Sequence, residues 1–348
     1  MNIMNLSKYY KKGYTGIDNL GNTCFLNSCL QVLNHSYELN EILDKKTEKQ
    51  MKDIPDSSIL KEWNDLRTVM WSGNGVVAPN KFVHNVHEIA KIKDKEIFTG
   101  WAQNDMPEFL LFIIDCMHNS TSRSISMKIN GNKENTVDEL AIECYSMLKG
   151  VYAKEYSEIM DLFFGISMTQ ILAKEDNKML STKPEHFFIL DLPVYCDNKI
   201  ATNIYECFDF YSNVEHMEGE NAWFNEKTNQ KEDVRKHTVF WNFPKILVIS
   251  LKRFSPDGTQ KINAMIDFPL DNLDLSKYIR GYNANSYKYD LYGICNHMGG
   301  VMGGHYTAFV KHADNKWIHF NDTKVEVLEE PKNVITPMAY CLFYRIRS

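Results

Sequence analysis

Near its N-terminus the chain reads Gly16-Ile17-Asp18-Asn19-Leu20-Gly21-Asn22-Thr23-Cys24-Phe25-Leu26-Asn27-Ser28-Cys29-Leu30-Gln31. The first half of this stretch is polar and rich in Gly, Asn and Asp, residues that suit turns and a positive φ. In the second half, apolar residues from Leu26 to Leu33 recur at the spacing of one helix face. The stretch therefore predicts a loop that runs into a helix, with Cys24 at the junction.

Cys24 lies at a position that favours nucleophilic chemistry. A thiol at the start of a helix meets unpaired backbone N–H groups and the positive end of the helix dipole, and both stabilise the thiolate. The alternative is a small buried residue without a chemical role, which is the commoner use of cysteine. A catalytic cysteine also needs a histidine, and an Asn or Asp that orients it, elsewhere in the chain.

Composition restricts the class of protein. Of the 348 residues, 44% are hydrophobic and 12% aromatic, which suffices for one elaborated domain or for two or three domains. The formal net charge of -6 argues against nucleic-acid binding, which needs a basic surface. No apolar run approaches the roughly 20 residues of a membrane span. The cysteine spacing suggests no disulfide framework, so we expect an intracellular protein of the cytoplasm, the nucleus or both, without membrane or nucleic-acid partners.

Helix signals dominate the first part of the chain and strand signals the second. Pro107 suits the first turn of an apolar helix, which Asp105 can cap unless it contacts a ligand instead. Residues 119–135 are polar and predict an exposed insertion, followed by a helix that the capping box Thr136-Val137-Asp138-Glu139 begins. From residue 163 onward, short alternating and apolar segments predict strands. This order predicts an α+β fold.

A second segment that could take part in catalysis lies near the C-terminus. Residues 298–304 are rich in glycine and predict a mobile loop that runs directly into a strand at His305. A second strand ends at Asn321, beyond a turn at residues 311–315. If these five residues are the hairpin loop, His305 lies directly opposite Asn321 on the same face of the hairpin.

Such a pair completes the requirements of a catalytic cysteine. Asn321 can bind one imidazole nitrogen of His305 and leave the other for a thiol. In the predicted register Asp322 points to the other face, and a bulge would make it the orienting residue instead. The rival interpretation is a buried structural histidine in an ordinary hairpin.

These segments resemble the ubiquitin-specific proteases, a family of papain-like cysteine peptidases. Residues 16–28 are similar to the cysteine box of the family, and residues 304–308 with 317–322 to its histidine box. The segment Gln103-Asn104-Asp105-Met106-Pro107-Glu108-Phe109 is similar to the family block Gln-Gln-Asp-Ala-x-Glu-Phe, and Leu251-Lys252-Arg253-Phe254 matches a further strand of the family. Four blocks in the order of the family are far more specific than any one of them.

The resemblance extends from about Tyr14 to Tyr344 and implies one catalytic domain, residues 14–348, after an N-terminal tail, residues 1–13. It implies the papain-like architecture of thumb, palm and fingers. The expected boundaries are a thumb at about 14–162 with an insertion at about 119–150, fingers at about 163–241 and a palm at about 242–348.

The resemblance also implies the site and its reaction. The implied reaction is cleavage of the peptide or isopeptide bond after the C-terminal glycine of ubiquitin, so the implied partners are ubiquitin and ubiquitinated proteins. The implied catalytic residues are Cys24, His305, Asn321 and, as donor to the oxyanion, Asn19, with Asp322 as the alternative orienting residue. The implied substrate-binding residues are Asp105, Glu108, Gly304 and Tyr306.

Zinc is the point at which the sequence departs from the family. Many members carry two Cys-x-x-Cys pairs in the fingers, which form a structural zinc site. Here residues 166–183 contain no cysteine, and Asn225-Glu226-Lys227-Thr228 stands where the second pair is expected. We predict that the protein binds no zinc and needs no other cofactor.

Three other functions stay open. The protein could be a catalytically weak or inactive ubiquitin-binding scaffold, a papain-like peptidase for unrelated proteins, or a protease for a ubiquitin-like modifier. The complete set of Cys24, His305, Asn321 and Asn19 argues against the scaffold. The block around Asp105 argues against unrelated protein substrates, because it matches a reader of the ubiquitin tail.

Overall fold

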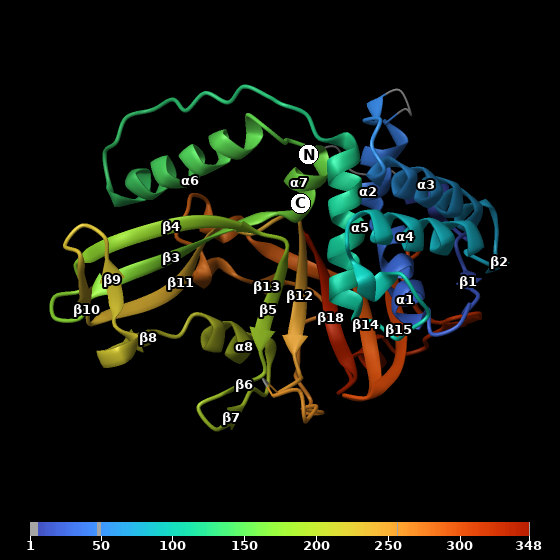
Figure 1. Ribbon diagram of the computed structural model, residues 1–348. Helices are drawn as coiled ribbons and strands as arrows, with labels where there is room; N and C mark the ends of the chain where they lie inside the picture. The colour runs from blue at the N-terminus through green and yellow to red at the C-terminus, as the bar shows by residue number, and fades with distance from the viewer. Residues whose placement is uncertain (1–5, 47–49, 256, 348) are drawn as a thin grey trace.

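A computed structural model describes residues 6–46, 50–255 and 257–347. Helices predominate up to residue 163 and strands after it, so the predicted α+β fold is confirmed (Figure 1). The main helices are η1 (Leu6–Tyr9), α1 (Cys24–Asn34), α2 (Tyr37–Asp44), α3 (Asp56–Ser72), α4 (Asn80–Ile92), η3 (Glu96–Phe98), α5 (Met106–Thr121), α6 (Thr136–Tyr152), α7 (Glu158–Phe163) and α8 (Ile204–Tyr211). In the described part of the chain, none of the helices combines the length and the apolar character that crossing a membrane requires.

Two sheets carry most of the strands. In the eight-stranded sheet the order is β17-β16-β15-β14-β18-β12-β5, with β13 paired to β14, and β12 with β5 is its parallel pair. Its strands are β5 (Ile189–Pro193), β12 (Ile246–Lys252), β13 (Leu273–Asp274), β14 (Lys288–Gly300), β15 (Gly303–Lys311), β16 (Trp317–Asn321), β17 (Lys324–Val327) and β18 (Ala339–Ile346). The four-stranded sheet has the order β4-β3-β11-β8, from β3 (Gly165–Ala173), β4 (Met179–Phe187), β8 (Glu215–Met217) and β11 (Val234–Asn242).

Three short strand pairs complete the fold. They are the parallel pair β1 (Thr15–Ile17) with β2 (Gly75–Val77) and the antiparallel pairs β6 (Tyr195–Cys196) with β7 (Lys199–Ile200) and β9 (Trp223–Asn225) with β10 (Gln230–Glu232). Figure 1 shows the eight-stranded sheet between helices α1–α5 on one side and the four-stranded sheet on the other. The numbered boundaries of thumb, fingers and palm remain predictions.

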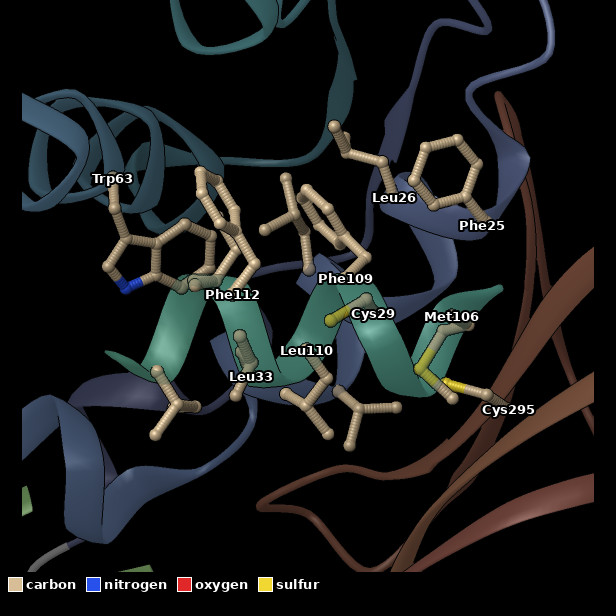
Figure 2. Packing of buried hydrophobic residues seen from close by; sticks show 14 of the residues in the cluster. Phe25, Leu26, Cys29, Leu33, Trp63, Met106, Phe109, Leu110, Phe112 and Cys295 are labelled. Atoms are coloured by element: carbon tan, nitrogen blue, oxygen red, sulfur yellow. The ribbon is translucent and has the colours of Figure 1, made fainter. Parts of the chain in front are cut away.

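Helix α1 is the centre of the core. It begins at Cys24, as the sequence predicts, but all of its residues are buried rather than one apolar face. The reason is that α5 packs on one side of it and strands β14, β15 and β16 on the other. Figure 2 shows Cys29 and Leu33 of α1 in one apolar cluster with Phe109 and Leu110 of α5. Some polar side chains of α1 find partners within the protein, as when Gln31 donates to the carbonyl of Thr15 at 2.8 Å.

The expected N-terminal tail packs against the domain from Leu6 onward, whereas residues 1–5 lie outside the described part. The ring of Tyr9 is 3% exposed, and its centroid lies 4.5 Å from that of Tyr37 and 4.6 Å from that of Trp71. The carbonyl of Lys12 accepts a hydrogen bond from His312 at 2.8 Å. The described part of this segment therefore belongs to the folded body.

The expected insertion contains α6, which packs on the four-stranded sheet through Ala141 and Cys144 (Figure 1). The predicted capping box is wrong by one residue, because the N-cap is Asn135 rather than Thr136. The side chain of Asn135 accepts from the N–H groups of Val137 and Asp138 at 2.8 and 3.1 Å, and Asp138 accepts in return from the N–H of Asn135. Both Asn–Asp and Thr–Glu can form a capping box, so the sequence pattern alone did not determine the register.

The corrected cap can be tested by substitution. We expect Asn135→Ala to destabilise α6 by about 1 kcal/mol, which accelerates amide exchange of its first turns roughly fivefold, because two N–H groups lose their acceptor. The matched variant Thr136→Ala should leave exchange nearly unchanged. Hydrogen exchange measured on peptides from residues 136–152 checks this, and a larger effect of Thr136→Ala would restore the register predicted from the sequence.

Candidate active site

The thiol of Cys24 lies at the first residue of α1 and is 3% exposed. Burial raises its pKa above the ordinary value for a cysteine, while a hydrogen bond from the backbone N–H of Tyr306 acts in the opposite direction. The thiolate that the sequence predicts follows from the helix terminus alone, without this desolvation. The start of the helix alone therefore does not favour a thiolate, and a catalytic role for Cys24 would need a base.

An imidazole on the neighbouring strand can serve as that base. Strand β15 carries His305 and packs against α1. The Nε2 of His305 lies 2.7 Å from the amide oxygen Oδ1 of Asn321. Because an amide oxygen accepts, Nε2 carries the proton, and Nδ1 is left unprotonated in the neutral ring. Such a nitrogen can accept a proton from a thiol.

The hairpin reaches this contact through a register that differs from the predicted one. With residues 311–315 as the loop, the predicted register pairs Val310 with Lys316. In the structure Val310 pairs with Ile318, so the predicted register is wrong by two residues. Because strand side chains alternate with a period of two, a shift of two keeps His305 and Asn321 on the same face. Diagonal neighbours on one face remain within reach of a long side chain, and the contact survives.

The glycine-rich segment is part of the hairpin rather than a loop. Gly299 pairs with Gly304 and Gly300 with Gly303, so strands β14 and β15 continue to a tight turn. A Cβ on Gly304 would lie 2.1 Å from the carbonyl oxygen of Met298 and 2.4 Å from Nε2 of His297. The close approach of the two strands next to His305 therefore requires glycine at position 304, whatever its role toward a substrate.

Asn19 and Asp322 form a second polar group beside Cys24. The Oδ1 of Asn19 accepts from the N–H groups of Gly21 and Thr23, each at 3.1 Å, and its Nδ2 donates to Asp322 at 3.0 Å. The other carboxylate oxygen of Asp322 accepts from Asn27 at 2.8 Å. Asp322 thus holds two amides around the start of α1, and it is Asn321 that accepts the hydrogen bond of the imidazole. Since an amide nitrogen carries two hydrogens, Asn19 keeps one for another acceptor.

Asp105 occupies the N-cap position of α5, but within the described residues its side chain makes no capping hydrogen bond. Its Oδ2 accepts from the hydroxyl of Tyr340 at 3.0 Å, and its Oδ1 is buried without a partner among the described residues. Burial raises the pKa of Asp105 to about 6, against the opposite effect of Tyr340. Capping, the alternative that the sequence left open, is therefore wrong, and one carboxylate oxygen is free for a ligand. Glu108 lies exposed in the first turn of the same helix.

Sequence reasoning missed Gln103 as a functional residue, although it lies within the block around Asp105. Its side chain donates to the carbonyl of Gly304 at 2.9 Å and accepts from the N–H of Gly304 at 2.8 Å. This pair of hydrogen bonds ties the segment before α5 to the residue before His305. The contact joins residues 201 positions apart, so local pattern carries no signal for it.

Tyr306 lies beside Cys24 with its ring turned into the protein. Its side chain is 7% exposed and packs against His297 and Tyr340, with ring centroids 4.7 and 6.1 Å away. The part of Tyr306 that reaches Cys24 is its backbone N–H. A contact between its ring and a substrate remains a prediction.

The residues at the expected zinc position do not fit zinc. Asn225 and Thr228, which stand where the second thiolate pair is expected, donate to the carboxylate of Glu232 at 2.9 and 2.6 Å. One carboxylate with an amide and a hydroxyl is a poor donor set for zinc, which prefers thiolate and imidazole. Across the residues that the structure describes, no group of three or more His, Cys, Asp or Glu is arranged to hold a metal ion.

Known proteins are similar to this sequence over nearly its whole length. A family model described as ubiquitin carboxyl-terminal hydrolase matches residues 15–344. The bovine and human proteins named ubiquitin carboxyl-terminal hydrolase 2 are each 33% identical to the chain, over 349 and 350 residues. These alignments include 97% of the chain and 56% of each relative, so the chain spans about half the length of these curated relatives.

Solved structures share the fold. A SAGA DUB module of Ubp8, Sgf11, Sus1 and Sgf73 bound to monoubiquitin matches with a TM-score of 0.74 and 25% identity, over 100% of this chain and 72% of that one. The same module bound to ubiquitin aldehyde matches with a TM-score of 0.73 and 25% identity, over 99% and 72%. The resemblance to the ubiquitin-specific proteases is confirmed, and the chain belongs to the ubiquitin carboxyl-terminal hydrolase family.

Proposed function

We propose that the protein is a deubiquitinating thiol hydrolase that cleaves the peptide or isopeptide bond after the C-terminal glycine of ubiquitin. The observation that supports this most is the 2.7 Å hydrogen bond between His305 and Asn321, on strands packed against the helix that begins at Cys24. Family membership supports ubiquitin as the substrate, and two structural neighbours are described as bound to monoubiquitin and to ubiquitin aldehyde.

The proposed reaction begins with proton transfer from the thiol of Cys24 to Nδ1 of His305. The thiolate attacks the carbonyl carbon of the ubiquitin C-terminal glycine, and the carbonyl oxygen becomes an oxyanion. The remaining N–H of the Asn19 amide and a backbone N–H near Cys24 stabilise that charge. His305 then protonates the leaving lysine amine as the C–N bond breaks, and later activates the water that releases ubiquitin from the acyl-enzyme.

Asn321 has a positioning role in this proposal. By accepting the Nε2 proton it fixes both the tautomer and the plane of the ring. It does so without adding a negative charge. The thiolate itself can stabilise the imidazolium once the proton has moved.

Asp105 is proposed to hold the basic C-terminal tail of ubiquitin. Its unpaired, buried oxygen lies at the start of α5, the helix that packs beside α1. A buried carboxylate oxygen without a partner is costly, so a cationic ligand that binds it gains more than at an exposed site. Glu108 supplies a second, exposed carboxylate one turn further along the helix.

The first prediction concerns the nucleophile. Incubation with ubiquitin that carries a C-terminal electrophile should give one covalent adduct at Cys24, detected by mass spectrometry. The variant Cys24→Ala should give none, whereas the control Cys29→Ala, at a buried position one turn along the same helix, should react like the native protein. Absence of an adduct on the native protein would remove the enzyme interpretation.

The same experiment separates the alternatives. Labelling that persists in Cys24→Ala would place the nucleophile at another residue. Labelling without repeated turnover of a ubiquitin amide would favour the weak or inactive scaffold. Faster turnover of an amide of a ubiquitin-like modifier than of ubiquitin would identify that modifier as the substrate.

The second prediction is a pH dependence that Asp105 causes. The pKa of Asp105 is raised to about 6 by burial, so its carboxyl is neutral below that pH and anionic above it. Binding of a basic tail should therefore strengthen, and KM fall, as pH rises from 5 to 7. The variant Asp105→Asn should raise KM on the order of tenfold at pH 7, or ~1.4 kcal/mol, and lose this pH step.

Glu108→Gln is the control for this measurement. It removes a neighbouring carboxylate, so it should raise KM while the step near pH 6 persists. If the step persists in Asp105→Asn and disappears in Glu108→Gln, the exposed carboxylate is the one that holds the tail. Circular dichroism of both variants verifies that α5 is still formed.

The third prediction concerns zinc. We propose that the protein binds none and that hydrogen bonds to Glu232 hold the turn between β9 and β10 instead. Metal analysis of purified protein should give far less than one zinc per chain, and a chelator should change neither the melting temperature nor the activity. Stoichiometric zinc, or a large drop in melting temperature with the chelator, would contradict this proposal.

A further inference from the structure

Lys261 links two segments that border the site. It follows β12 in a short turn, where the N–H of Ile262 donates to the carbonyl of Arg253 at 2.7 Å. Its half-buried side chain leaves this turn and reaches strand β14. There its Nζ donates to the carbonyl of His297 at 2.6 Å and to that of Gly299 at 3.3 Å.

The two carbonyls lie at a particular place in the hairpin. They flank Met298, which pairs directly with His305 across β14 and β15. Gly299 itself pairs with Gly304, the residue before the histidine. The ammonium group of Lys261 therefore holds the piece of strand that lies opposite the imidazole.

His297 at one end of this piece is buried against Tyr306, but from Met298 to the turn the hairpin has little side-chain packing of its own. Glycines occupy both arms next to the turn, and Met302 at the turn is 97% exposed. Hydrogen bonds from neighbouring segments must therefore fix its position. Gln103 holds the β15 arm through both backbone groups of Gly304. On the β14 arm the N–H of His297 donates to the carbonyl of Met338 at 2.8 Å, and Lys261 holds the carbonyls of His297 and Gly299. The segment before α5 thus holds β15, and the segment after β12 holds β14.

The backbone around Lys261 is itself held in place. The guanidinium of Arg253 is fully buried and donates to the carbonyls of Ile262 at 3.1 Å, Ala264 at 2.8 Å and Ala339 at 2.7 Å. Ala339 begins β18, one residue before the tyrosine that binds Asp105. The turn that carries Lys261 is therefore fixed to the sheet rather than free in solvent.

A contact of this kind adds little to the stability of the fold. In the described part of the chain, Lys261 has no carboxylate within ion-pair distance, so its charge is balanced by carbonyl dipoles alone. Burial lowers the pKa of Lys261, and the positive charge of Arg253 acts in the same direction. Desolvation of the ammonium offsets much of what two hydrogen bonds contribute. Its main effect is on where the strand lies.

We infer that Lys261 is a positioning residue for the proposed reaction, which holds residues 297–299 so that His305 keeps its geometry toward Cys24. It acts through the β14 backbone and contacts none of the reacting atoms. The inference rests on the proposed function where hydrolysis is concerned. Its effect on the proton transfer between Cys24 and His305 can be measured without ubiquitin.

The experiment compares Lys261→Met, Lys261→Arg and the control Lys252→Met, which removes an exposed lysine at the end of β12. Hydrolysis of a ubiquitin C-terminal amide with a small fluorescent leaving group gives kcat and KM. Alkylation of Cys24 by iodoacetamide between pH 5 and 9, followed on the Cys24 peptide by mass spectrometry, reports the proton transfer. Thermal unfolding reports the fold.

Lys261→Met should lower kcat by about tenfold or more and leave KM within about twofold, because misplacement of a catalytic group affects the chemical steps. It should also slow alkylation of Cys24 below pH 8, where the thiolate depends on the imidazole. Lys261→Arg should recover most of both rates, since a guanidinium also donates to two carbonyls. Lys252→Met should behave like the native protein.

Other results would overturn the inference. Native kcat and alkylation in Lys261→Met would show that the contact positions nothing. A rise in KM alone would make Lys261 a substrate contact. Equal losses in Lys261→Arg and Lys261→Met, together with a lower melting temperature, would make its role purely structural. If the native protein is alkylated normally but does not hydrolyse ubiquitin amides, the proposed function fails, and the alkylation rates of the variants still decide the role of Lys261.

Discussion

Burial of the Cys24 thiol is the constraint on which the rest of the site depends. The thiol starts a helix that is enclosed on both sides, so water that would solvate a thiolate is largely absent and the pKa is raised. The helix dipole and the backbone N–H groups then offset part of the desolvation penalty of the thiolate, and they do not by themselves create a thiolate. In the proposed reaction an imidazole takes the proton from the thiol, which makes the nucleophile depend on the placement of His305.

That placement depends on hydrogen bonds as well as on the packing of the Tyr306 and His297 rings beside it. On the turn side of His305 the two strands consist largely of glycine, which gives close approach and few side chains to interlock. Asn321 fixes the ring, Gln103 fixes the backbone before it and Lys261 fixes the opposite strand. Each contact exchanges water for a protein partner at little net gain in free energy. The geometry of the site is therefore less strongly held than the core around α1.

The sequence predicted the features that depend on local pattern and on periodicity. The start of α1 at Cys24 follows from a change of composition, and the contact of His305 with Asn321 survived a register error of two because side chains alternate with that period. A register error of one would have lost it. The cap of α6 was misplaced by one residue because neighbouring residues offer equivalent chemistry. Gln103 and Lys261 could not be found, since their partners lie 201 and 36 positions away and no spacing rule connects them.

Asp105 shows why family pattern and structure are needed together. The sequence allowed capping or ligand contact, and its backbone does occupy the N-cap position. The side chain instead turns to Tyr340 of β18, a strand whose first residue is held by Arg253. A carboxylate held at that depth, with one oxygen unsatisfied, is unfavourable in the free protein and becomes favourable when a cation arrives. In the proposed function such a group would contribute to recognition because it costs stability in the absence of its ligand, which is the opposite of the capping role that the local sequence suggested.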